Sequence, residues 1–448
     1  MTIPAPETPA PLAGLHRLEP DARLDLLQQQ RRLDQRDRAV LDAGLSLPQA
    51  DAMSENVVGR YALPYGIATN FLVDGEELAV PMAVEEPSVV AAASKAAKLA
   101  RTCGGFRTEA TPNLMGGHIQ LVNVPDIDEA QRTLAAAERE LLAHIPTRGS
   151  LLARGGGPRS LTTRHIPHSE AGPILLVELT MDVADAMGAN IVNTTLEALA
   201  PLVAELTGGE VVLSILSNLC VQRLATAEVL YTWNALADSR TEGRNLQRRI
   251  VQADALAQAD PHRAATHNKG ILNGVEAVAM ATGNDCRAVA AAAHAWAAGE
   301  GRYRGLTRWM VVPDADALPR DSLVRTRGVD PAGPLLHGRL TLPLALGVAG
   351  HSTRAHPLVP ISLKLLGNPD SRRLARIAAA VGLAQNLAAL LALVDTGIQA
   401  GHMRLHARQV ALAAGVPAGQ VARVAAEMVA SRRISTEAAL SFHSSLAT

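Results

Sequence analysis

The sequence predicts an α+β protein in which a mixed large domain surrounds one buried helix and carries an inserted ferredoxin-like module. Three patterns support this fold class. Strand and helix patterns alternate between about 113 and 219, residues 371–397 are apolar nearly all round, and residues 398–448 have a helical pattern. A helix without a polar face belongs inside a protein. We therefore expect residues 371–397 to pass through the core of the large domain.

The composition excludes several classes of partner. The chain has 448 residues, enough for two or three domains with cores of their own. Its 42 Lys and Arg residues nearly balance 43 Asp and Glu residues, so no basic surface for nucleic acid or an anionic membrane is evident. Aromatic residues make up only 2% of the chain, which argues against platforms that stack bases. We expect neither nucleic acid nor a membrane surface as a partner.

The cysteines and the hydropathy pattern predict a cytoplasmic protein. Cys103, Cys220 and Cys286 lie far apart, form no CxxC pair and follow no signal peptide. This usage is typical of reduced proteins that lack a disulfide framework. No stretch of 18 residues is wholly apolar, so we expect no membrane span.

The chain before residue 113 predicts a tail, a helix and a hairpin. Residues 1–14 are rich in Pro and Ala and are expected to be disordered. Residues 24–44 have the pattern of one charged amphipathic helix. Residues 55–86 alternate apolar and polar side chains, with Asp74-Gly75 as the hairpin turn. Taken alone, the ENVVG stretch at the start of this segment predicts the beginning of a strand.

A second helix is predicted directly after Glu86. Pro87 suits the first helical position, and Gly104-Gly105 would end the helix. Glu86 would then lie at a helix N-terminus, where a carboxylate complements the helix dipole.

The module between about 113 and 219 lacks the usual dinucleotide signature. No GxGxxG follows a strand, and ARGGGPRS (153–160) does not have that spacing, which argues against a Rossmann fold. The stretch DAMGAN (185–190) follows a predicted strand, and a helix is expected from Ala186. As an isolated motif, DAMGAN equally fits a helix start whose Gly allows close packing.

Polar chemistry is concentrated between Arg263 and Gly299. His267, Asn268 and Lys269 precede a predicted loop-like break at Gly270 and Asn273, and Asp285 opens an Ala-rich helix. A cation and a carboxylate at the ends of elements can polarise a carbonyl group. The alternatives are ordinary: Asp285 as a helix N-cap and Lys269 as a solvated loop lysine.

Five motifs in order give the sequence a family resemblance. They are ENVVGRYALPYG (55–66), AVEEPSVVAAASKAAKLAR (83–101), DAMGANIVNT (185–194), the 263–299 segment and GHMRLHAR (401–408). Together they resemble the soluble, class II bacterial form of 3-hydroxy-3-methylglutaryl-coenzyme A (HMG-CoA) reductase and span most of residues 55–408. The resemblance implies interconversion of HMG-CoA and mevalonate plus coenzyme A, an isoprenoid-pathway reaction, by two hydride transfers with NADH or NADPH.

The resemblance also implies the site residues. The catalytic residues would be Glu86, Lys269, Asp285 and His402. Substrate would be bound by Arg263, Ser88, Asn273 and Asn218. The nicotinamide cofactor would be bound by Asp185, Met187, Gly188, Asn190 and Arg148. No metal is required, and the ENVVG motif implies a homodimer or larger homo-oligomer with the site at the subunit interface.

The implied roles follow from the chemistry of each side chain. The Lys269 ammonium would stabilise the oxyanion formed at the thioester, and Asp285 would hold that ammonium. Glu86 would move the proton at the reacting carbonyl, although a helix dipole and proton donation make opposite demands on a carboxyl group. His402, on a C-terminal flap over 398–448, would protonate the departing thiolate.

Cofactor choice is open at the level of sequence. NADH-using relatives carry an aspartate a few residues before the GGG, whereas this chain has Thr147-Arg148-Gly149-Ser150. An Arg accommodates the 2′-phosphate of NADP, and an acidic residue favours NAD. We hypothesise that Arg148 relaxes or reverses an NADH preference. Arg148 as a solvated loop residue is the plain alternative.

Parts of the sequence are compatible with two other functions. A zinc hydrolase could use His402 and His406, four residues apart, with Asp285, but no Glu follows the first His and no third clear ligand is present. A non-catalytic acyl-CoA-binding protein on the same fold would not need all four matched catalytic residues.

The expected domains are a tail (1–14), a large domain (15–112 and 220–397) with an insertion of unknown purpose at 311–336, the inserted module (113–219) and the flap (398–448).

Overall fold

A four-stranded antiparallel sheet and one buried helix form the centre of the large domain. The computed structural model describes residues 12–145, 149–299, 301–324, 333–350, 355–395 and 398–446, apart from the side chains of 149, 150, 315 and 398–405. The sheet order is β3-β8-β10-β9. Its strands are β3 (Arg107–Ala110), β8 (Leu224–Tyr231), β10 (Leu335–Pro343) and β9 (Thr307–Val312).

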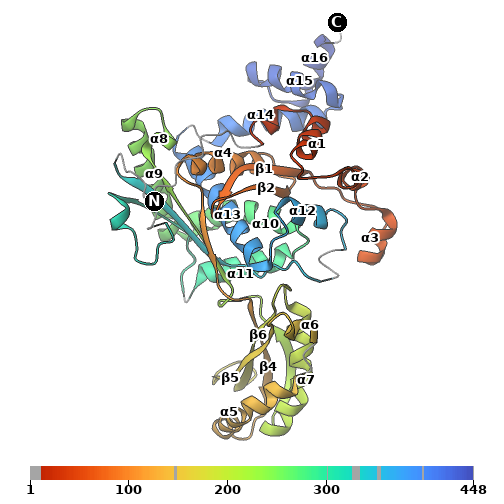
Figure 1. Cartoon of the computed structure of the whole chain (residues 1–448), viewed down its shortest axis with the longest axis vertical. Coiled ribbons are helices and arrows are strands. Elements are labelled where there is room, and N and C mark those ends of the chain that lie inside the picture. Colours follow the sequence, from red (N-terminus) through yellow and green to blue (C-terminus); the bar gives the residue numbers. More distant parts are fainter. Residues whose placement is uncertain are drawn as a thin grey trace.

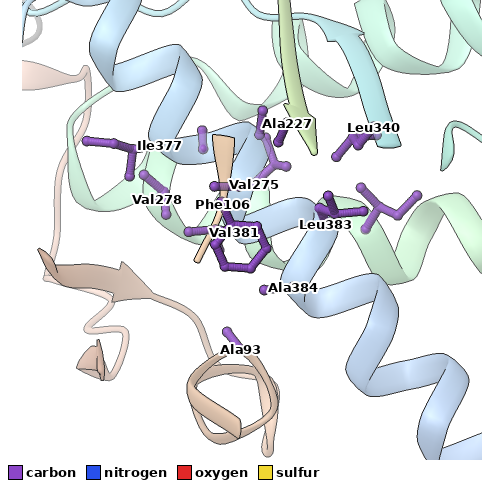
Figure 2. Packing of buried hydrophobic residues seen from close by; sticks show 14 of the residues in the cluster. Ala93, Phe106, Ala227, Val275, Val278, Leu340, Ile377, Val381, Leu383 and Ala384 are labelled. Carbon is purple, nitrogen blue, oxygen red and sulfur yellow. The ribbon is translucent and has the colours of Figure 1, made fainter. Parts of the chain in front are cut away.

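Helix α13 (Ser371–Val394) lies across one face of this sheet. Its side chains are buried on almost every side, which confirms the prediction of a core helix from the apolar stretch 371–397. By length and composition alone it is apolar enough to cross a membrane, but 72% of that window is buried inside the protein. Figure 2 shows Phe106 in the middle of the cluster that α13 forms with the sheet and α10 (Pro261–Ala281).

Two glycines allow α10 and α13 to pack closely. A Cβ added at Gly274 of α10 would lie 3.1 Å from the Cβ of Gln385 and 3.2 Å from the carbonyl oxygen of Val381, both on α13. A Cβ at Gly382 of α13 would lie 2.8 Å from Val275. The close contact at these two glycines therefore fixes the position of α10 relative to α13.

The predicted hairpin is confirmed, but its first strand starts later than expected. Strands β1 (Tyr65–Val73) and β2 (Glu76–Ala83) pair antiparallel around Asp74-Gly75. The ENVVG stretch before them is not a strand, and its Val58 side chain is fully exposed. Helix α4 (Val89–Thr102) follows β2 and packs on β1 and α13.

The N-terminal part consists of short helices. The single helix predicted over 24–44 is wrong: α1 (Pro20–Gln29) and α2 (Gln35–Ala43) are separate, because Asp34 forms a capping box that starts α2. Residues 1–11 of the predicted disordered tail lie outside the described residues. Leu12, inside the predicted tail, is buried against α1 and α12 (Val359–Leu365). The remaining elements here are η1 (Leu15–Arg17) and α3 (Leu47–Met53).

Residues 114–216 form a second, smaller unit with its own core, the lower lobe in Figure 1. Its antiparallel sheet has the order β5-β6-β4-β7, and α5 packs against α7 over it, as a ferredoxin-like unit requires. Helix α7 begins three residues after the predicted Ala186. The elements are β4 (Leu114–Val122), α5 (Ile127–His144), α6 (Gly149–Leu152), β5 (Gly157–Ile166), β6 (Ile174–Asp182), α7 (Ala189–Thr207) and β7 (Glu210–Leu216).

Within the predicted insertion at 311–336, the described residues 313–324 follow β9 and cover the far face of the large sheet. Leu318 and Val324 pack there against Leu230 of β8. The buried carboxylate of Glu228 accepts hydrogen bonds from the Ser322 hydroxyl at 2.6 Å and the Leu323 amide at 3.1 Å. The ends of the predicted insertion belong to the strands, and a 3-10 turn, η2 (Ala315–Ala317), lies between them.

The other helices complete the large domain and the C-terminal segment. In the large domain they are α8 (Trp233–Leu236), α9 (Arg240–Ala259) and α11 (Cys286–Ala298). The C-terminal helices share a small core and lie at the opposite end of the molecule from the smaller unit (Figure 1). They are α14 (Ile398–Ala413), α15 (Ala418–Ala430) and α16 (Thr436–Leu446).

We expect Gly274→Leu to destabilise the protein by about 3 kcal/mol, because the added side chain has no room between α10 and α13. Gly270→Leu is the matched control on the same helix, since a Cβ at Gly270 meets nothing within 4 Å. It should be neutral or slightly stabilising, because Leu favours a helix over Gly. Thermal unfolding of both variants measures the difference. Equal melting temperatures would contradict the close-packing account.

Candidate active site

Lys269 lies in the middle of helix α10. The sequence predicted a loop-like break around Gly270, and this prediction is wrong, because α10 runs unbroken through it. The helix begins at Pro261, where Asp260 accepts hydrogen bonds from two first-turn amides. One glycine inside a helix costs only about 1 kcal/mol. The tertiary packing of α10 outweighs that cost and places Lys269 on a rigid element.

The ammonium of Lys269 forms an ion pair with the carboxylate of Glu86. Glu86 follows strand β2, and 183 residues separate the two partners, so the pair depends on the packing of β2 against α10. The Lys269 side chain is 59% exposed and that of Glu86 34% exposed. The ammonium is therefore held by one acid while its other side is open to solvent, where a substrate carbonyl can approach it.

Backbone strain accompanies the pair. Ser88, two residues after Glu86, has a φ of 74°, a left-handed conformation that residues other than Gly rarely adopt. Helix α4 begins only at Val89, so the prediction that Pro87 is its first residue is wrong. Glu86 thus lies outside the first turn, where the helix dipole acts less on it. Strain of this kind costs about 1–3 kcal/mol and clusters at functional sites, and Ser88 is a predicted substrate residue.

Behind Lys269, α10 is fastened by buried polar contacts. The His267 Nε2 lies 2.6 Å from the Thr307 hydroxyl and 3.1 Å from the Asn386 amide nitrogen. Thr307 donates to Asp254 at 3.0 Å, and Trp309 Nε1 donates to Asn386 at 2.7 Å. Burial lowers the pKa of His267 to about 3, so the imidazole is neutral at pH 7. Burial raises the pKa of Asp254 to about 6.

Asn268 is also turned inward. Its amide donates to the carbonyl of Arg304 at 2.9 Å and accepts from the amide of Leu306 at 2.9 Å. The sequence grouped His267, Asn268 and Lys269 as one polar cluster. The helix separates them: the first two fix α10 against β9 and α13, and only Lys269 faces the site.

Asp285 has its own partners. Its carboxylate caps α11 by accepting from the amides of Arg287 at 2.9 Å and Ala288 at 3.1 Å. The adjacent Cys286 thiol donates to the carbonyl of Glu276 at 3.4 Å, so this corner lies beside α10 about two turns past Lys269. Among the described residues no hydrogen bond or ion pair joins Asp285 to Lys269. That contact stays a prediction for the assembled protein.

The predicted substrate residues are spread along α10 and two loops. Asn273 follows Lys269 by one turn and shares its face. Arg263 lies on the first turns of the same helix, where burial lowers its pKa. Within the described ranges, neither side chain has a hydrogen-bond or ion-pair partner, so both are available to a ligand. Asn218 is exposed in the loop between β7 and β8.

The DAMGAN stretch forms the turn between β6 and α7. Gly188 is required there, because its φ is 111° and an added Cβ would lie 2.9 Å from Val183 and 3.0 Å from Met115. Ala184, just before the motif, has a φ of 48°, a second strained residue beside a predicted site. Asn190 is exposed in the first turn of α7.

The Asp185 side chain forms hydrogen bonds with the large domain. It accepts from the Ser371 amide at 3.0 Å and the Ser371 hydroxyl at 3.1 Å, which ties the motif to the start of α13. The loop after β10 also meets the motif: a Cβ at Gly347 would lie 2.3 Å from the backbone nitrogen of Met187. The same Gly347 donates its amide to Asn284 at 2.7 Å. DAMGAN is thereby linked through one loop to the corner that carries Asp285.

Comparisons with known proteins show which family the chain belongs to. The family model for hydroxymethylglutaryl-coenzyme A reductase matches residues 19–407. A 3-hydroxy-3-methylglutaryl-coenzyme A reductase from Archaeoglobus fulgidus is 44% identical over 94% of this chain and 92% of its own length. A probable reductase of this name from Borreliella burgdorferi is 32% identical over 80% of this chain and 77% of its own.

The chain belongs to the HMG-CoA reductase family. A solved reductase from Streptococcus pneumoniae has a TM-score of 0.79 and 40% identity, and the match covers 97% of this chain and 99% of that one. A class II structure from the same organism, described as bound to NADPH in open conformations, has the same TM-score and covers 86% of this chain and 100% of its own. The predicted family and fold class are confirmed.

One residue at the DAMGAN turn was missed by the sequence analysis. Arg223, only 3% exposed, donates to the carbonyls of Met187 at 2.8 Å, Ala186 at 3.2 Å and Leu346 at 2.6 Å. Burial lowers its pKa to about 10. An isolated Arg before a strand carries no sequence signal, because its role depends on three carbonyls that only the fold brings together. In this HMG-CoA reductase relative, Arg223 joins the smaller unit to the large domain.

Two predicted residues of the family site have side chains that the structure does not describe. Arg148 falls in the gap at 146–148. The backbone of His402 belongs to α14, but its side chain is among those not described. In the described part of the chain no three His, Cys, Asp or Glu side chains are grouped as metal ligands. The zinc alternative depends on the His402 side chain, which lies outside that part.

Proposed function

We propose that this protein is a class II-type HMG-CoA reductase that interconverts HMG-CoA and mevalonate plus coenzyme A. Reduction of the thioester to the alcohol consumes two hydrides and two protons and releases one thiol. NADH or NADPH supplies the hydrides when bound. The observation that carries the proposal is the Lys269–Glu86 ion pair, formed by two residues of the family motifs on separate elements.

Lys269 stabilises the negative charge that gathers on the thioester oxygen. The ammonium is fixed on α10 and open on one side, so it is placed before the reaction and need not be reorganised during it. Glu86, in contact with the same ammonium, moves the proton at the reacting oxygen. Proton exchange within the pair lets both groups serve each of the two reductions.

Arg263 and Asn273 bind the substrate. HMG-CoA carries a free carboxylate, and a guanidinium is the natural partner for it. The guanidinium of Arg263 is half-buried without a partner among the described residues, which leaves it available. Asn273, one turn from Lys269, offers an amide to the substrate hydroxyl or carbonyl oxygen. Ser88 and Asn218 supply further polar contacts.

The DAMGAN turn fits a dinucleotide. Gly188 opens a helix of 19 residues, and the first amides of such a helix attract a pyrophosphate. The glycine also lets the turn pack closely against Val183 and Met115, which fixes the start of the helix. Met187, Gly188 and Asn190 would line this site, and Asp185 would hold the turn in place through Ser371.

The site is completed by a second copy of the chain. The exposed stretch 55–61 presents two large apolar side chains, Val58 fully exposed and Tyr61 92% exposed, which suit a subunit interface. Asp285 lies about two helical turns from Lys269 in one chain, so Asp285 of the partner subunit is the acid that meets the Lys269–Glu86 pair. In this arrangement the partner subunit contributes both that aspartate and the smaller unit, which would bind the cofactor.

Lys269→Ala is expected to lower kcat for HMG-CoA reduction by more than about 100-fold, because the oxyanion loses its cation. Thermal stability should change little, since a half-exposed ion pair contributes less than about 1 kcal/mol. Loss of reduced-nicotinamide absorbance measures turnover, and Lys98→Ala, an exposed lysine on α4, is the control. Near-normal turnover of Lys269→Ala would refute the role of Lys269. If the wild-type protein binds HMG-CoA but does not oxidise the cofactor, it is an acyl-CoA-binding protein and not a reductase.

His402→Gln should slow thioester reduction while sparing reduction of free mevaldehyde, because only the first reaction expels a thiolate that needs a proton. The matched control is His406→Gln, one turn along α14, where the side chain is exposed. Steady-state kinetics with both substrates give the comparison. An equal loss with HMG-CoA and mevaldehyde would remove the leaving-group role.

Arg148 is proposed to bind the 2′-phosphate of NADPH. We expect Arg148→Gln to reduce the ratio of kcat/KM for NADPH over NADH by about tenfold, the loss of roughly one charged hydrogen bond. Arg139→Gln, an exposed residue of α5, is the control for a general charge effect. A wild-type protein with a strong NADH preference, or an unchanged ratio in Arg148→Gln, would contradict this role.

A further inference from the structure

The buried side chain of Arg223 is shared between two segments that carry parts of the site. Its Nη1 donates to the carbonyl of Met187 at 2.8 Å, and its Nη2 donates to the carbonyls of Ala186 at 3.2 Å and Leu346 at 2.6 Å. The first two carbonyls belong to the DAMGAN turn, and the third belongs to the loop after β10. One guanidinium group therefore holds the turn and the loop together.

These three carbonyls are the hydrogen-bond partners of the guanidinium, which forms no ion pair in the part of the chain that the structure describes. Burial lowers the pKa of Arg223 to about 10, while Cys220, Asp182 and Asp185 act in the opposite direction, so the group is charged at pH 7. Asp182 is itself bound by Arg159 at 3.2 Å. A buried charge that loses its hydrogen bonds costs free energy. Movement of any of the three carbonyls is therefore opposed.

The contact with Met187 also orients the start of α7. The carbonyl and the amide of a trans peptide point in opposite directions. Fixing the Met187 carbonyl therefore fixes the direction of the Gly188 amide, which belongs to the same peptide group. Gly188 directly precedes the first turn of α7, whose amides have no partners within the helix. Arg223 thus acts on the backbone at which the dinucleotide is proposed to bind, without reaching the ligand itself.

The loop after β10 is also held from a second side. The Asn284 side chain accepts a hydrogen bond from the Gly347 amide at 2.7 Å, and Gly347 follows Leu346, the residue that Arg223 binds. Asn284 directly precedes Asp285, the N-cap of α11. Two side chains thus bind adjacent residues of one loop, and they connect the DAMGAN turn to the corner that carries Asp285.

We propose that Arg223 is a positioning residue that holds the DAMGAN turn, and with it the cofactor, in a fixed place relative to the corner that carries Asp285. This role rests on the reductase function and the cofactor site proposed above. Arg223 touches neither cofactor nor substrate in this role. Its loss weakens cofactor binding, whereas binding of HMG-CoA, which depends on Arg263 and Asn273 of α10, changes little.

Isothermal titration calorimetry of the whole protein tests the role without turnover. NADPH and NADH are titrated in parallel, and the cofactor that the wild type binds more tightly is used for the variants. We expect Arg223→Met to raise the Kd for this cofactor by at least about tenfold, because three hydrogen bonds that hold the turn are lost. Arg223→Lys keeps the charge but has one donor nitrogen where Arg223 uses two, so it should raise the Kd less, by about threefold.

Two further variants separate positioning from a general loss of stability. Arg101→Met is the matched control, because Arg101 is also a buried arginine of the large domain, paired with Glu77 away from the turn. It should lower the melting temperature and leave the cofactor Kd unchanged. Asn284→Ala removes the second anchor of the loop and should raise the cofactor Kd by about threefold, the effect of one hydrogen bond.

A cofactor Kd that rises no more in Arg223→Met than in Arg101→Met would overturn the proposal. So would an unchanged Kd in Asn284→Ala, or an equal loss of affinity for HMG-CoA and cofactor in Arg223→Met. If Arg223→Met does not fold, Arg223→Lys decides the matter, and an unchanged cofactor Kd in that variant contradicts the role. A wild-type protein that binds the cofactor but does not reduce HMG-CoA would instead refute the proposed function, on which these titrations do not depend.

Discussion

The ion pair between Lys269 and Glu86 is the interaction on which the proposed chemistry depends. The packing of the large domain positions both partners. Its partners are half-exposed and contribute little to stability. The rigidity comes from elsewhere. Buried contacts of His267 and Asn268 fix one side of α10, and Gly274 lets α13 fix another. The ammonium is thus placed by the core and left free to act on a substrate.

The described structure divides the family site into two parts. One part surrounds Lys269, and the other joins Asp285 to the DAMGAN turn through Asn284 and Gly347. Each part has a strained residue beside it, Ser88 near the first and Ala184 near the second. The proposed subunit interface would bring the two parts together.

The sequence was informative where periodicity or turn chemistry decides the structure. The apolar stretch 371–397 and the Asp74-Gly75 turn gave a core helix and a hairpin, as observed. It failed where tertiary contacts override local preference. Gly270 suggested a break near Lys269, but packing keeps α10 continuous. The inward turn of His267 and Asn268 and the carbonyl contacts of Arg223 arise only when distant segments meet.

A crystal structure of the protein with HMG-CoA bound would test the central claim most directly. The account requires the Lys269 Nζ within about 3 Å of the thioester oxygen, in hydrogen-bond contact, while Glu86 remains beside the ammonium. A thioester oxygen bound by other donors, with the Lys269 ammonium directed into solvent, would contradict it.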